Sequence, residues 1–200
     1  MAHLLFMNPD IPLTESHAEA SSTLLPIARA AIASPLGKPL TADESAPWLR
    51  KHGATFITLN LAKKLRGCIG SLQAHRPLLD DVKANACAAA FKDPRFKPLT
   101  ATEYGSIEIE ISLLSPLTAL KFTDETSALA QLKPNVHGVI FQYGHHRSTY
   151  LPQVWDNFSD PAMFMATLKQ KAGLPPNFWE PGIEIHVYTV AKLRESPPQA

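Results

Sequence analysis

The sequence has few cysteines, few glycines and almost no excess charge of either sign. Two of its 200 residues are cysteines and nine are glycines, and 19 basic side chains are balanced by 18 acidic ones, which leaves a formal net charge of +1. Two thiols in a chain without an export signal are typical of a reduced cytoplasmic protein rather than of a disulfide framework. The balanced charge argues against an acidic disordered tail and against a strongly basic nucleic-acid coat.

Long apolar runs are absent as well. No segment approaches the ~20 consecutive apolar residues of a membrane span. Near the N-terminus the apolar residues are interrupted at positions 8–10 and no basic segment precedes them, which argues against a signal peptide. We therefore expect a cytoplasmic protein with no membrane partner. The chain is rich in proline, with 18 residues, and its 45% of hydrophobic residues are enough for one core or two small lobes.

The hydrophobic patterns predict an α+β fold with a mainly antiparallel sheet flanked by helices. Period-two alternation and β-branched residues indicate strands at residues 54–59, 65–72, 107–113, 136–143, 148–151 and 183–188. Helices are expected at residues 24–33, 77–91 and 160–173, with shorter helical segments after residue 100 and over 124–132. In the first helix, Thr23 would be the N-cap and Pro26 would take the third helical position.

The strand partners follow from the same patterns. The two strands on either side of residues 60–64 should form a hairpin. The strand over residues 107–114 should lie in the same antiparallel sheet, with Ile107, Ile109 and Ile111 on its buried face.

Residues 65–72, Leu-Arg-Gly-Cys-Ile-Gly-Ser-Leu, carry the strongest chemical signal. Glycine inside a strand costs stability, so Gly67 and Gly70 mark a bulge or the close approach of a ligand or another segment, and we expect a ligand. Cys68 lies between them, and on a regular strand Arg66 shares its face, where a guanidinium favours the thiolate over the thiol. The alternative is a small buried thiol in a bulged core strand.

The segment Leu65–Gly70 resembles the signature of the AMMECR domain family, whose prokaryotic members are known as AmmeMemoRadiSam system protein A. Further matches follow in the family's order: Ala90–Phe96, Glu103, Glu110–Ser112, Leu114–Pro116, Val136–Gly138, Tyr150–Val154 and Lys171–Leu174. We expect one AMMECR-like domain over residues 22–193, an N-terminal arm over residues 1–21 and a C-terminal tail over residues 194–200. The resemblance implies two lobes, with the signature near the cleft between them.

The resemblance implies partners but no reaction. The system name implies association with a Memo-like protein and a radical S-adenosylmethionine (SAM) enzyme. The chain is not itself that enzyme, because Cys68 and Cys87 cannot supply the three close thiolates that its iron–sulfur cluster needs. We expect no cofactor and no metal site in this chain.

Three residues outside the signature are further candidates for the site. His137 belongs to the Val-His-Gly match and is the candidate general base for Cys68; the alternative is a histidine that is hydrogen-bonded to the backbone. Arg95 and Glu110 are candidate ligand-binding residues. Alternatively, Arg95 forms an ion pair with Asp93, and Glu110 lies on an exposed strand face.

Other polar residues have simpler interpretations. Glu103 fits a capping box that begins at Thr100. His145 and His146 fall in the turn expected at residues 144–147, and two adjacent strand residues make a poor metal site. A group of basic residues forms either an anion-binding rim or a solvated surface: Lys63, Lys64, Arg66, Arg76, Lys92, Arg95 and Lys97.

These observations leave alternative functions open. In the one we favour, the protein is an accessory module that binds a small molecule, a peptide or a nucleotide near Arg66–Gly70. In another, Cys68 is the nucleophile of an enzyme, Arg66 favours its thiolate and His137 moves protons. RNA binding or RNA modification is a third function, against which the near-neutral charge argues.

Overall fold

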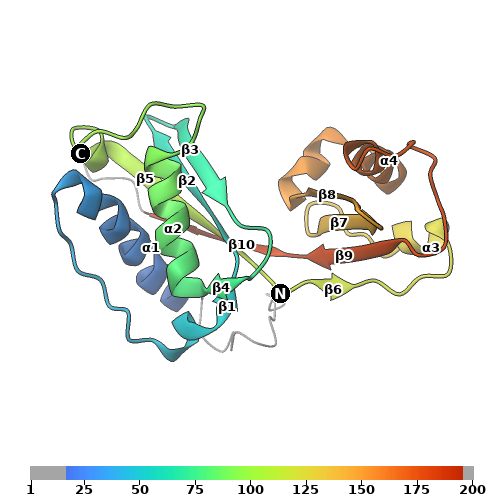
Figure 1. The fold of residues 1–200 in the computed structure, drawn as a ribbon, viewed down its shortest axis with the longest axis horizontal. Helices are drawn as coiled ribbons and strands as arrows, with labels where there is room; N and C mark the ends of the chain where they lie inside the picture. Colours follow the sequence, from blue (N-terminus) through green and yellow to red (C-terminus); the bar gives the residue numbers. More distant parts are fainter. Residues whose placement is uncertain (1–16, 196–200) are drawn as a thin grey trace, which may run out of the picture. The chain divides into compact units, whose positions relative to one another are not determined.

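The structure, a computed structural model, describes residues 17–195 and consists of two compact units. The first unit contains the described residues up to Pro116 together with those from Ala191 onward, and the second unit is Leu117–Val190. Each has its own hydrophobic core and its own four-stranded sheet (Figure 1). No helix among the described residues is long and apolar enough to cross a membrane.

The first unit is a four-stranded sheet covered by two helices (Figure 1). The strand order is β10 (Val190–Arg194), β5 (Ile107–Leu114), β2 (Thr55–Leu61) and β3 (Lys64–Gly70). The helices are α1 (His17–Ala33), which packs against β5, and α2 (Leu78–Phe91), which packs against β2 and β3. Both β3 and β5 run antiparallel to β2. The predicted hairpin and its shared sheet are therefore confirmed.

The alternating isoleucines of β5 have the predicted orientation. Ile107, Ile109 and Ile111 are each at most 1% exposed and lie in the core that the two helices cover. Strand geometry places the intervening side chains on the opposite face of the sheet. This outer face carries Glu110 and the polar residues that line up with it.

Helix α1 begins earlier than predicted. It starts at His17, so residues 17–21 of the expected arm are helical, and residues 1–16 lie outside the described part of the chain. Thr23 is not an N-cap, and Pro26 lies in the helix interior. Proline there removes one backbone hydrogen bond. Burial of six apolar side chains holds the helix on the core despite that loss: Leu24, Leu25, Ile27, Ala28, Ile32 and Ala33.

The chain returns to the first unit in β10, a strand that the sequence analysis did not predict. Arg194 is its last residue, and Glu195 accepts a hydrogen bond from the Ile109 backbone N–H at 2.9 Å. Glu195 also forms an ion pair with Arg29 of α1, whose guanidinium donates to the Ile107 carbonyl oxygen at 2.9 Å. Residues 194 and 195 therefore belong to the fold and not to a tail, and residues 196–200 lie outside the described part.

The second unit is a sheet in the order β6 (Thr118–Ala119), β9 (Glu184–Tyr188), β7 (Gly138–Tyr143) and β8 (His146–Tyr150). Its helices are α3 (Glu125–Leu129) and α4 (Pro161–Lys171). The predicted N-cap of α4 is confirmed, because the Asp160 carboxylate accepts the Met163 N–H at 2.8 Å. In the core, the rings of Trp155 and Phe164 stack with their centroids 3.6 Å apart.

The turn between β7 and β8 is shorter than predicted. Tyr143 pairs with His146, so only Gly144 and His145 lie between the paired residues. His146 is therefore a strand residue, and its Nδ1 is hydrogen-bonded to the Ala172 carbonyl oxygen at 2.9 Å. The smaller elements are β1 (His52–Gly53), β4 (Arg76–Pro77) and 3₁₀ helices at Ser34–Leu36, Pro47–Arg50, Tyr104–Ser106 and Pro152–Asn157.

Candidate functional site

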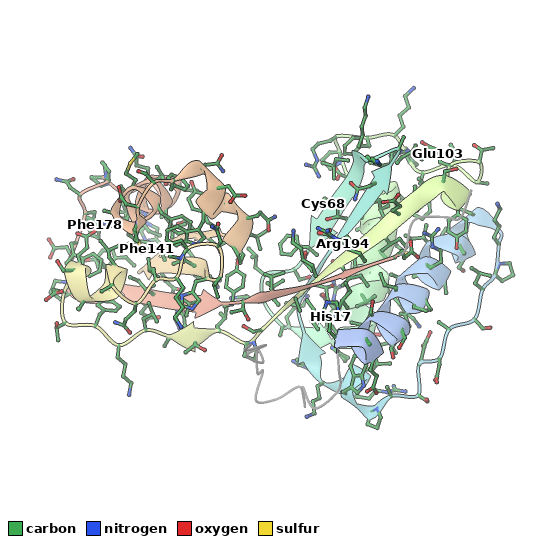
Figure 2. The ribbon with its side chains drawn as sticks, turned by 180° about the vertical axis from the view of Figure 1, so that it is seen from behind. His17, Cys68, Glu103, Phe141, Phe178 and Arg194 are labelled. Atoms are coloured by element: carbon green, nitrogen blue, oxygen red, sulfur yellow. The ribbon has the colours of Figure 1, made fainter. Side chains whose placement is uncertain are left out.

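Cys68 lies in a row of polar side chains on the outer face of the first unit's sheet. Thr58 of β2 pairs with Cys68 on one side and with Glu110 on the other, so the three side chains share a face. The Thr58 hydroxyl donates to Cys68 Sγ at 3.4 Å. At the other end of the row, Glu110 forms ion pairs with Arg194 at 2.5 Å and Lys192 at 3.5 Å (Figure 2 labels Cys68 and Arg194).

A β-bulge removes Arg66 from this row. Along the hairpin Leu59 pairs with Gly67, whereas the next residue, Asn60, pairs with Leu65. Arg66 is thus the extra residue of the bulge and does not continue the regular alternation that the sequence analysis assumed.

The guanidinium of Arg66 binds a carboxylate instead of facing the thiol of Cys68. Its Nε and Nη2 donate to Glu103 at 2.9 and 3.2 Å. The Arg66 hydrogen bond and a backbone N–H from Thr100 lower the pKa of Glu103 to about 2. Glu103 and Thr100 also exchange the reciprocal hydrogen bonds of a capping box. Arg66 therefore fixes the loop after α2, and its expected support of the Cys68 thiolate is not what the structure shows.

Arg95 is the cation that contacts Cys68. Its Nη2 donates to the Cys68 carbonyl oxygen at 3.2 Å, and the Cys68 N–H donates to Asp93 Oδ2 at 2.9 Å. Because β3 is an edge strand, the N–H and the carbonyl oxygen of Cys68 have no neighbouring strand to pair with. The Asp93 and Arg95 side chains form these hydrogen bonds instead. The predicted Asp93–Arg95 ion pair is present at 2.7 Å, and it has this additional role in holding the signature strand.

The Asp93–Arg95 pair is asymmetric in exposure. The Asp93 side chain is 2% exposed and that of Arg95 is 54% exposed. Hydrogen bonds from the Arg95 side chain, followed by those from backbone N–H groups, hold the pKa of Asp93 well below its usual range. The hydrogen bond to Asp93 raises the pKa of Arg95, and Cys68 contributes to the same shift. A fixed carboxylate thus orients a guanidinium that is still accessible to an anion.

Replacing Asp93 by asparagine should change how stability depends on pH. A carboxyl group whose pKa is lowered on folding stabilises the folded state at pH values above its unfolded pKa of ~3.9, and this contribution is lost as the pH falls. The Asp93→Asn protein should therefore be less stable than the natural chain at neutral pH, with a difference that shrinks in acid. Urea unfolding at pH 7 and pH 3 measures this, with exposed Asp80→Asn as control. Equal pH dependence in the Asp93→Asn and natural proteins would contradict the assignment.

The two glycines of the signature are in close contact with other parts of the first unit. A Cβ at Gly67 would overlap the Ala89 carbonyl oxygen of α2, and a Cβ at Gly70 would overlap the Phe56 ring. The structure contradicts the hypothesis that these glycines leave room for a ligand. Glycine is required because a helix backbone and an aromatic ring approach the strand.

His137 belongs to the second unit, in the turn that precedes β7. Its Nδ1 accepts the Lys133 N–H at 3.2 Å, and its carbonyl oxygen accepts the Trp155 indole N–H at 2.6 Å. Burial, followed by the charge of Lys133, lowers the pKa of His137, which favours the neutral imidazole. These contacts fit the alternative interpretation, in which His137 is hydrogen-bonded to the backbone. That His137 is the general base for Cys68 stays a prediction.

A buried polar cluster in the first unit was missed by the sequence analysis. Asp81 is fully buried, and its carboxylate accepts hydrogen bonds from Thr55, Ser71, Arg76 and Asn85. The cluster joins the start of β2, the chain after β3 and the helix α2. A signal was present, because Asp81 and Asn85 are four residues apart on a helix whose neighbouring positions, Leu78 and Val82, are apolar.

The expected anion-binding rim is partly neutralised. Three of its seven basic residues are ion-paired: Arg66 with Glu103, Arg76 with Asp81 and Arg95 with Asp93. Of these three arginines, Arg95 has the most exposed side chain. Within residues 17–195 there is no group of three or more histidine, cysteine or carboxylate side chains that could hold a metal ion.

Comparison with known proteins identifies the family. The AMMECR1 family model matches residues 25–193. Protein MJ0810 of Methanocaldococcus jannaschii is 35% identical over 167 residues, covering 82% of this chain and 83% of that protein. A protein of Methanothermobacter thermautotrophicus is 36% identical over 178 residues, covering 86% and 93%. The crystal structure of uncharacterized protein PH0010 from Pyrococcus horikoshii aligns with a TM-score of 0.74 and 30% identity, covering 90% and 93%. The chain belongs to the AMMECR1 family.

Proposed function

We propose that the protein is a non-catalytic binding module whose ligand contacts the outer sheet face at Cys68 and Arg95. One observation carries this proposal: the half-exposed Arg95 guanidinium is held against the Cys68 backbone by the buried carboxylate of Asp93. A cation that is fixed in this way needs no reorganisation to receive an anionic group. In the same proposal, the module is an accessory to a radical SAM enzyme and a Memo-like protein, as the family resemblance implies.

The side chains around Arg95 indicate the chemistry of the ligand. Nε and Nη2 of Arg95 already donate to Asp93 and to the Cys68 carbonyl oxygen, so the Nη1 N–H groups are left to bind a carboxylate or a phosphate. The Thr58 hydroxyl and the Cys68 thiol, which are hydrogen-bonded to each other, add weaker polar partners on the sheet face. Phe96 adds an aromatic ring, 5.5 Å from the centre of the Arg95 guanidinium. We infer a small molecule or a peptide that presents an anionic group to Arg95, while the rest of the ligand lies on the sheet.

Cysteine-dependent catalysis is the second candidate, and the Arg95 guanidinium favours it, because it is bound at the Cys68 carbonyl oxygen and its pKa is raised in part by Cys68. A neighbouring cation is one of the features that activate a cysteine. Among the described residues of the first unit, however, the hydrogen-bond partner of Cys68 Sγ is the Thr58 hydroxyl, and the thiol has no imidazole partner. A nucleophilic cysteine normally has a base within hydrogen-bond reach.

Binding to purified partners tests the proposal. The natural chain should bind the radical SAM enzyme or the Memo-like protein from the same organism in calorimetry. Arg95→Gln should weaken that binding about tenfold, the effect of losing one charge-assisted hydrogen bond at a desolvated contact. Lys97→Gln, which removes one positive charge from the same loop, is the matched control. The absence of binding to either protein, or equal effects of the two variants, would overturn the proposal.

Thiol chemistry separates the two candidates. For a binding module, Cys68→Ser should retain partner binding, and iodoacetamide should alkylate Cys68 no faster than it alkylates free cysteine. Cys87→Ser isolates the Cys68 signal in this measurement. Rapid alkylation near pH 6 together with loss of function in Cys68→Ser would favour the enzyme.

A further inference from the structure

The second unit contains a groove that the proposed function does not use. Its volume is about 740 Å³, and it lies between residues 119–124 and residues 179–186. The ladder between β6 and β9 ends where the Leu120 N–H donates to the Ile185 carbonyl oxygen at 2.9 Å. After this hydrogen bond the chain leaves β9 and continues to α3 (Figure 1), and the groove opens beside the separated segments. Its volume is in the range of sites for small organic ligands.

Two aromatic rings contribute to the apolar lining of the groove. Phe122 and Trp179 lie with their ring centroids 5.5 Å apart, and both pack against the core of the second unit. The ammonium of Lys169 lies 5.3 Å from the Trp179 ring centroid and is itself ion-paired with Glu125. The rings are therefore held in place without a ligand, as expected of a preformed site.

Charged side chains line both sides of the groove. Asp124 lies on one side, and Glu180 and Glu184 lie on the other, with Lys121 as the one lysine or arginine in the lining. Hydrogen bonds from Ser127 and Thr123 lower the pKa of Asp124, so this carboxyl group stays ionised. Within residues 17–195, neither Glu180 nor Glu184 takes part in an ion pair.

The aromatic rings beside the carboxylates favour an organic cation as the ligand. The described residues contain no group of three or more metal-ligating side chains in this groove or elsewhere. The three carboxylates line the same groove as Phe122 and Trp179. Ammonium and guanidinium groups bind both to carboxylates and to aromatic faces.

We propose that this groove binds a flexible aliphatic cation that carries ammonium or guanidinium groups. The aliphatic chain lies on Phe122 and Trp179, and the charged groups contact Glu180 and Glu184 on one side and Asp124 on the other. Such a cation is either a free polyamine or a basic side chain of a peptide, and the two sources share the same chemistry. The inference is independent of the proposed function, which concerns the first unit.

Tryptophan fluorescence tests the groove directly. Trp179 is half-buried, whereas Trp48 and Trp155 are 5% and 2% exposed, so a ligand in the groove should change the emission of Trp179. Titration with spermidine and, separately, with the peptide acetyl-Lys-Arg-Lys-amide should give a saturable change with at least one probe. The change should disappear in Trp179→Phe, and binding should weaken as the sodium chloride concentration rises.

Charge variants decide whether the groove carboxylates cause the binding. Glu180→Gln and Glu184→Gln should each weaken binding up to about fivefold, the effect of one solvent-accessible ion pair. The matched control is Asp156→Asn, an exposed carboxylate of the same unit outside the groove, which should leave affinity within twofold of the natural chain. Binding of spermidine alone identifies a polyamine site, and binding of the peptide alone identifies a peptide site. No saturable change with either probe at millimolar concentration, or equal effects of all three variants, would overturn the proposal.

Discussion

Replacing Gly67 by alanine should lower the free energy of unfolding by about 3 kcal/mol, because the added Cβ would overlap the carbonyl oxygen of Ala89. The next nearest atom, the Ala89 carbonyl carbon, would lie 3.1 Å from that Cβ. Both atoms are backbone atoms of α2 and cannot rotate away as a side chain would. Either the helix or the strand must move, and α2 is fixed by the buried side chains of Leu78, Val82 and Ala86. We expect Tm to fall by about 5–10 °C.

Gly105→Ala is the matched control for this substitution. Gly105 is exposed, and a Cβ at this position would meet no atom within 4 Å. The same chemical change should therefore leave the free energy of unfolding within about 0.5 kcal/mol of the natural value. Thermal and urea unfolding of both variants measure this difference in the free energy of unfolding. A Gly67→Ala protein as stable as Gly105→Ala would show that α2 does not require the glycine, and space for a ligand at this position would again have to be considered.

Replacing Asp81 by alanine should lower the free energy of unfolding by about 3 kcal/mol, because several buried donors lose their shared acceptor. The carboxylate accepts hydrogen bonds from the Thr55 N–H at 2.8 Å, the Thr55 hydroxyl at 2.7 Å and the Arg76 Nε at 2.8 Å. Ser71 and Asn85 donate to it as well. Removal leaves these donors without their shared acceptor in a site with no solvent access at Asp81, and unsatisfied buried donors are expensive.

The neighbouring residue supplies the control for Asp81. Asp80 also lies in the first turn of α2, so Asp80→Ala removes the same charge from the same end of the helix dipole. Asp80 is exposed, and we expect its replacement to cost less than about 1 kcal/mol. Urea unfolding of the two variants separates the buried hydrogen bonds from the helix-dipole effect. Equal losses in the two proteins would contradict the structural role of the Asp81 cluster.

The fold of each unit could be predicted largely from local patterns. The alternation of Ile107, Ile109 and Ile111 predicted both a strand and its buried face, since side chains of a strand alternate between the faces of a sheet. The N-cap of α4 at Asp160 was likewise readable, because capping involves only residues three positions apart. The start of α1 could not be predicted in this way, because tertiary burial of its apolar face outweighs the cost of Pro26 in the helix interior.

The candidate site was located by its sequence but explained only by its contacts. The signature Leu65–Gly70 and the family were predicted from the residues, and the AMMECR1 family is confirmed. The reason for the glycines was wrong, because sequence spacing shows that side chains are missing without showing what takes their place. A helix backbone at Gly67 and an aromatic ring at Gly70 occupy the two positions.

The sequence by itself determined the longer strands other than β10, most of the helices and the family, because these depend on periodicity and on ordered motifs. Only the tertiary structure decided which charges meet across long stretches of the chain. A one-residue bulge turned Arg66 toward Glu103, 37 positions away, and left Arg95 at Cys68, 27 positions away. Glu195 reaches Arg29 across 166 positions. The partner of a charged side chain depends on the path of the whole backbone, and no local pattern of residues encodes that path.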